Sequence, residues 1–69
     1  MMAAEDNYDQ TPTPLDLIRL EDLDIGDGMN SECGKWSVFR YENEFLLFFE
    51  DGRQLDYPNI TSIIRFLSN

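Results

Sequence analysis

The chain has 69 residues, a formal net charge of −9, one cysteine and no histidine. This length allows a single small domain, and one thiol without a histidine excludes an intrachain disulfide and a zinc site. Five Lys and Arg stand against 14 Asp and Glu, which excludes the clustered positive charge that binds nucleic acid phosphates directly.

The chain is expected to act in the cytoplasm without membrane contact. Its first residues, Met1 to Asp6, lack the positive and apolar regions of a secretory signal. The longest unbroken apolar run, Phe45 to Phe49, is too short to span a membrane.

The N-terminal segment is predicted to be a tail. Residues 1–13 lack apolar periodicity and run into two Thr-Pro pairs. Polar segments of this kind favour disorder. We therefore expect a disordered acidic tail over residues 1–13 and a single small domain over residues 14–69.

A helix start is predicted at Thr13. Threonine can cap a helix, Pro14 suits the first helical position, and Asp16 supplies an acid at the third. The helix would be short and end before Gly26. An extended segment is the alternative, because apolar and polar residues also alternate over residues 15–17.

Three strands are predicted after a loop over residues 24–34. Residues 36–41 are rich in β-branched and aromatic side chains, residues 44–50 contain the apolar run, and residues 53–57 end at Pro58. Glu42-Asn43 is a candidate tight turn. Asp51-Gly52 suits a two-residue type I′ hairpin.

The last segment, residues 60–67, fits two structures. Its apolar residues recur at helical spacing, and Asn59 can cap that helix. Its β-branched content favours a fourth strand instead. The chain as a whole predicts an α+β fold: a small antiparallel β-meander of three to four strands with one or two short helices.

The strand register decides which side chains share a face. Two-residue turns would pair Trp36 with Phe49 and Phe48 with Leu55. One face then carries Phe39, Tyr41, Leu46, Phe48, Leu55 and Tyr57, and the other carries Trp36, Val38, Phe45, Leu47 and Phe49. A face of this kind left in water would forfeit on the order of 10 kcal/mol of burial, so both should be covered.

Few residues outside the predicted strands remain to cover both faces of the sheet. The C-terminal segment can cover one face, and the other needs residues 15–25, a second copy of the chain or another protein. The set Trp36, Val38, Phe45, Leu47 and Phe49 is therefore a candidate surface for partner binding or self-association.

The negative charge is concentrated in the front half. Residues 1–34 hold nine of the 14 acidic residues and a single arginine. Candidate residues for contact with a basic protein surface are Asp22, Asp24, Asp27 and Glu32. Spaced carboxylates can mimic the phosphates of a nucleic acid, so a nucleic-acid-binding protein is the expected partner. The alternative is a solvated, solubilising surface.

Catalysis is not expected. The thiol of Cys33 has no histidine to serve as its base, and neither a cofactor motif nor a metal-ligand pattern is present. Size, charge and missing catalytic groups make the chain similar to small acidic inhibitors made by phages and mobile elements, which occupy nucleic-acid-binding or regulatory surfaces of host proteins. No motif carries this similarity, so no residue role follows from it.

The function that this pattern favours is that of a non-catalytic binding protein, which would inhibit or modulate its partner in the cytoplasm of a host cell. The alternative is a homo-oligomeric structural or adaptor protein, assembled through an apolar sheet face.

Overall fold

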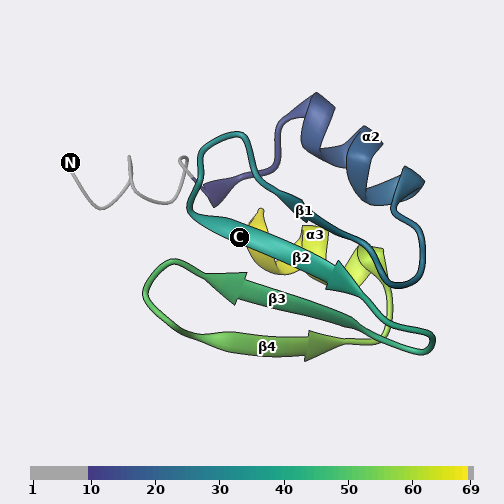
Figure 1. Ribbon diagram of the computed structural model, residues 1–69. Coiled ribbons are helices and arrows are strands. Elements are labelled where there is room, and N and C mark those ends of the chain that lie inside the picture. Colours follow the sequence, from purple (N-terminus) through teal and green to yellow (C-terminus); the bar gives the residue numbers. More distant parts are fainter. Residues whose placement is uncertain (1–9, 69) are drawn as a thin grey trace, which may run out of the picture.

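The computed structural model describes residues 10–68. Their elements, in chain order, are α2 (Pro14–Asp22), β1 (Gly28–Asn30), β2 (Trp36–Arg40), β3 (Phe45–Phe49), β4 (Gln54–Tyr57) and α3 (Ile60–Leu67). The strands form one antiparallel sheet in the order β1-β2-β3-β4 (Figure 1). The predicted α+β fold with a β-meander is confirmed.

Both helices begin where the sequence predicts. At α2 the Thr13 side chain accepts a hydrogen bond from the Asp16 amide at 3.1 Å, and the Asp16 carboxylate accepts one from the Thr13 amide at 3.1 Å. At α3 the Asn59 side chain accepts from the Ser62 amide at 2.9 Å. The ambiguous last segment is thus a helix, because its apolar stripe finds a core in which to bury Ile63.

Strand β1 lies inside the segment that was expected to be a loop. It is three residues long and pairs Met29 with Val38. A Cβ at position 28 would lie 3.2 Å from the Phe39 ring, so glycine lets that ring lie against the strand. Three residues are too few to show the alternation of apolar and polar side chains that predicts a strand. The strand is therefore recognised only by its pairing with β2.

The first hairpin has the predicted register and the second does not. Trp36 pairs with Phe49 as expected, whereas Phe48 pairs with Gln54 rather than Leu55. The turn contains three residues, 50–52, and Gly52 alone takes a positive φ, of 98°. A type I′ turn would need positive φ at Asp51 as well, but the Asp51 carboxylate instead accepts from the Arg53 amide at 3.0 Å.

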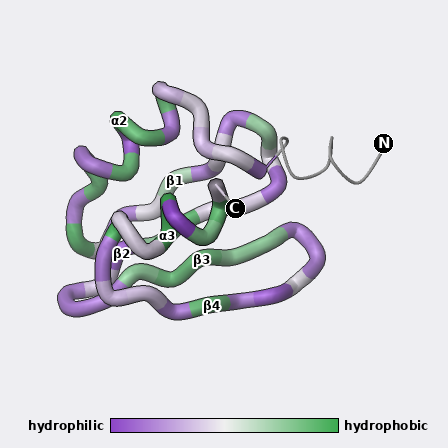
Figure 2. Tube along the Cα trace, turned by 180° about the vertical axis from the view of Figure 1, so that it is seen from behind, coloured by the Kyte–Doolittle hydropathy of each residue, from purple (hydrophilic) through white to green (hydrophobic). Residues whose placement is uncertain are grey.

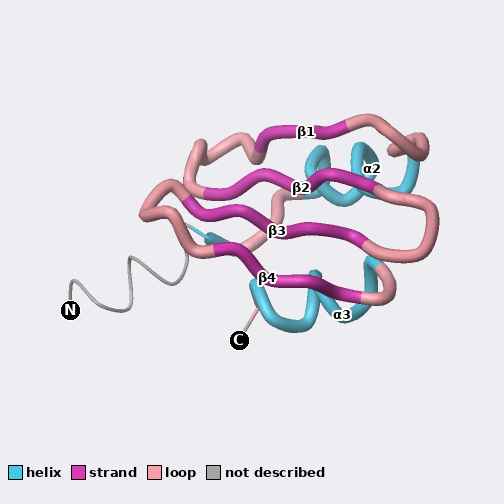
Figure 3. The backbone as a smooth tube through the Cα atoms, turned by 60° about the horizontal axis from the view of Figure 1, so that its bottom comes forward, coloured by secondary structure: helices cyan, strands magenta, loops and turns pink. Residues whose placement is uncertain are grey.

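This one-residue slip moves the side chains of β4 to the opposite faces. Leu55 and Tyr57 join Phe45 and Leu47 on what we call the core face. Both helices cover that face (Figure 3), and strand β3 in its centre is hydrophobic along its length (Figure 2). The buried core consists of Leu20, Leu23, Trp36, Val38, Phe45, Leu47, Phe49, Ile63 and Leu67.

The prediction that this face is a surface for a partner or a second copy is therefore corrected. The five residues proposed for partner binding or self-association, Trp36, Val38, Phe45, Leu47 and Phe49, are all at most 8% exposed. Helices α2 and α3 supply the cover, because both pack on the same side of the sheet. Within residues 10–68, no helix covers the other side (Figure 3).

That uncovered side, the open face, has an apolar centre. Phe39, Leu46 and Phe48 are partly exposed there, and the exposed Tyr41 ring lies 4.9 Å from that of Phe39.

The folded chain begins before the predicted domain boundary. The Trp36 indole donates a hydrogen bond to the Gln10 carbonyl at 2.8 Å, and Thr13 caps α2. Residues 10–13 thus contact the domain. The remainder of the predicted tail, residues 1–9, lies outside the described residues.

Candidate partner-binding groove

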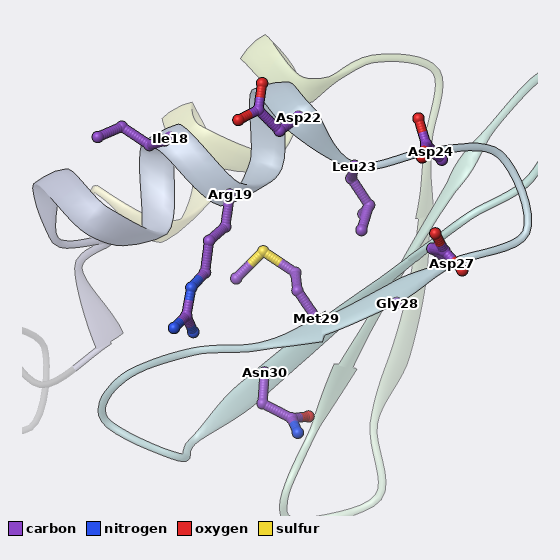
Figure 4. Close-up of a pocket in the computed structure, with 9 residues that line it drawn as sticks. All are labelled: Ile18, Arg19, Asp22, Leu23, Asp24, Asp27, Gly28, Met29 and Asn30. Atoms are coloured by element: carbon purple, nitrogen blue, oxygen red, sulfur yellow. The ribbon is translucent and has the colours of Figure 1, made fainter.

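A groove of about 400 Å³ runs between α2 and the outer edge of β1. We call it the α2–β1 groove. Its lining residues are Ile18, Arg19, Asp22, Leu23, Asp24, Asp27, Gly28, Met29 and Asn30 (Figure 4). Leu23, the residue that follows α2, and Met29 of β1 both project into the space between the helix and the strand, so the groove has an apolar floor beneath a charged rim.

The backbone of the sheet and the Arg40 side chain hold the acidic end of this groove in place. Arg40 Nη1 donates to the Leu23 carbonyl at the end of α2, at 2.5 Å. The Arg40 amide donates to the Asp27 carbonyl at 2.9 Å, and the Gly26 amide donates to the Arg40 carbonyl at 2.7 Å. The segment that carries Asp24 and Asp27 is therefore fixed at both ends by one residue of β2.

The charges on the rim are separated along the groove. Asp22, Asp24 and Asp27 lie where the chain leaves α2 and enters β1, whereas Arg19 extends toward the Asn30 end (Figure 4). Among residues 10–68, none of these four charged side chains makes a hydrogen bond or ion pair. Their charges are thus available to a partner.

The structure brings together three of the four predicted acidic residues. Glu32 lies away from the groove, where its carboxylate accepts a hydrogen bond from the Thr13 hydroxyl. Its amide donates to Asp16 Oδ1 at 3.1 Å. Glu32 therefore belongs to the junction between α2 and the loop after β1.

Sequence reasoning missed the apolar part of the groove. Ile18 is 57% exposed on α2, and Met29 packs partly against the core. The helical spacing would have identified Ile18 as lying off the buried stripe of Leu20. No local pattern marked Met29, because its position depends on the pairing of β1 with β2.

Three features of the described residues concern metal-ligating, nucleophilic and titratable side chains. In residues 10–68, no three His, Cys, Asp or Glu side chains gather as a metal site would require. The exposed Cys33 thiol lies 3.3 Å from the Ser31 hydroxyl. The pKa of Asp51 is lowered, chiefly by the hydrogen bond from the Arg53 amide, but this exposed carboxylate serves the β3–β4 turn.

Across the described residues, neither helix has the length and apolar character needed to cross a membrane. Comparison with protein-family models, with curated proteins and with solved structures finds no match to this chain.

Proposed function

We propose that this protein is a non-catalytic acidic binding protein that inhibits or modulates a partner by occupying a basic, nucleic-acid-binding surface of it. The observation that supports this function is the α2–β1 groove, whose rim gathers Asp22, Asp24 and Asp27 with no intramolecular partner among residues 10–68. A phage or mobile-element inhibitor acting in a host cytoplasm fits this size and charge.

Electrostatics favours such a partner over others. A chain with net charge −9 repels nucleic acids and accelerates its encounter with a basic protein surface. The unpaired carboxylates lose no internal ion pair when they meet lysine or arginine. The apolar floor then contributes contact area that excludes water.

The proposal is tested by capturing partners from the native host and titrating the captured protein by calorimetry at low and high salt. Affinity should fall as salt rises, because the charges involved are exposed. Reversing Asp22 and Asp24 to lysine should weaken binding by about tenfold and leave the fold intact.

The matched control reverses Glu50 and Asp56, two exposed acids at the far side of the sheet. It changes the net charge equally. If both double variants lose the same affinity, the groove has no special role. Affinity that is indifferent to salt contradicts the proposal as a whole.

A second candidate function is homo-oligomeric assembly, and the open face is the observation that favours it. Phe39 pairs with Leu46 across β2 and β3, with Phe48 beside them, so a twofold axis could stack two such sheets. This assembly would use the face opposite to the one expected from the sequence. The net charge of each copy opposes it.

A further inference from the structure

The outer edge of β1 has unused backbone hydrogen-bonding groups. Antiparallel strands alternate between hydrogen-bonded and non-hydrogen-bonded pairs. The amide of Arg40 bonds to the Asp27 carbonyl, and the amide of Ser31 bonds to the Trp36 carbonyl. By this alternation the N–H and C=O groups of Gly28 and Asn30 point away from β2.

Those peptide groups open onto the α2–β1 groove. Gly28 and Asn30 are both exposed, and both line the groove of about 400 Å³. Within residues 10–68 their outward groups have no partner. Figure 4 shows the Asn30 side chain turned away from α2, so it does not block the edge.

We propose that the partner contributes an extended segment that pairs with β1 and lies in the α2–β1 groove as a fifth strand, with its basic residue at the Asp24–Asp27 end. This inference rests on the proposed function and specifies how the partner is held. Main-chain hydrogen bonds to Gly28 and Asn30 provide the pairing, and the groove side chains select the segment.

The register gives the added strand a side-chain pattern. Its residue opposite Met29 faces α2, because paired residues project to the same face. That residue meets Leu23 and Ile18, so it should be apolar. Residues on either side of it project toward the open face, next to Gly28 and Asn30, and are less restricted.

The charges on the rim set the polarity of the segment. Asp24 and Asp27 favour lysine or arginine at the end where the chain enters β1. Arg19, near Asn30, disfavours a second basic residue at the other end. A segment with one basic end and an apolar centre fits better than a uniformly basic one.

The probe is a short capped peptide with a single lysine near one end, a valine at its centre and threonine at its other positions. A second peptide has the same sequence but carries N-methyl groups on the residues that would donate to β1. Both have equal charge and the same side chains, and only the first can form the ladder. Amide hydrogen exchange, measured by NMR, should slow at Gly28 and Asn30 with the first peptide, which should bind at least fivefold more tightly.

Protein variants test the same edge from the other side. Asn30→Pro removes one outward N–H but no bond to β2, a position at which an edge strand tolerates proline. Asn30→Ala keeps that N–H. The first variant should weaken binding of the unmodified peptide by about tenfold, and the second should bind it as the unmodified protein does.

The outcomes separate this inference from the proposed function. Salt-sensitive binding of both peptides with equal affinity overturns strand addition and leaves an acidic binding surface. No binding of either peptide, with salt-sensitive binding of a captured partner intact, also overturns strand addition. If Asn30→Pro fails to fold, the comparison of the two peptides on the unmodified protein decides alone.

Discussion

Asp16 joins two parts of the chain through a single carboxylate. One oxygen accepts from the Thr13 amide within the helix cap, and the other accepts from the Glu32 amide. The side chain is 1% exposed, so removing it leaves two part-buried amides without their acceptor. The free-energy penalty of an amide shielded from water without an acceptor is larger than the stabilisation that an exposed hydrogen bond provides.

Asp16→Ala is therefore expected to destabilise the protein by about 1–3 kcal/mol. Thermal unfolding followed by circular dichroism measures the change. Asp22→Ala is the matched control, because it makes the same substitution at an exposed position in the last turn of the same helix. An acid there opposes the helix dipole, so the control should be neutral or slightly stabilising. Equal losses in both variants would contradict the role of Asp16.

Residue-scale reasoning from the sequence succeeds for local contacts and fails for distant ones. The pairing of Thr13 with Asp16 was predicted because a cap and its acid lie three residues apart. The contact of Asp16 with Glu32 spans 16 positions and has no local pattern. For the same reason the sequence predicts Glu32 to act with Asp22, Asp24 and Asp27, whereas the fold places it against Thr13 and Asp16.

At the scale of elements, the β3–β4 turn determines which side chains of β4 reach the core. The turn depends on Gly52, whose φ of 98° other residues rarely adopt. Nothing lies within 4 Å of a Cβ built at this glycine. The cost of a substitution there is thus conformational rather than steric.

Gly52→Val should destabilise the protein by about 1–3 kcal/mol, measured by urea unfolding. Asn43→Ala, in the β2–β3 turn, is the control, because no residue other than glycine has a positive φ within residues 10–68. It should change stability by less than about 0.5 kcal/mol. A Gly52→Val protein as stable as its control would show that the turn adopts another geometry.

The strands and helices were predictable where the pattern is long or the cap is strong. β2, β3, β4 and α2 follow the predicted segments closely, and α3 occupies the segment that fitted both a helix and a strand. The turn after β3 was misassigned by one residue, because Asp-Gly serves both two-residue and three-residue hairpins. β1 had no signal of its own, so the groove that it forms with α2 was not predictable either.

At the scale of the whole molecule, the helices cover the faces of the sheet differently from the expectation. The sequence of 69 residues predicts too little material to cover the strand at 45–49 on both sides. The chain shelters one side fully, because both helices pack there, and leaves Phe39, Leu46 and Phe48 partly exposed on the other. The sequence predicts that both faces of the sheet are apolar, but it does not determine which face the helices cover.

Salt distinguishes the two candidate functions at this scale. Association of like-charged copies strengthens as salt screens their repulsion, whereas binding to a basic partner weakens. We expect the isolated protein to remain monomeric by light scattering from low to high salt. Growth of a dimer with rising salt, abolished by Phe48→Lys on the open face, would favour assembly through that face instead.

The ring of Phe39 takes the space that a side chain at position 28 would fill. A side chain at position 28 therefore requires the Phe39 ring to shift by a few tenths of an ångström. We therefore expect related sequences with a larger residue at position 28 to carry a smaller residue than phenylalanine at position 39.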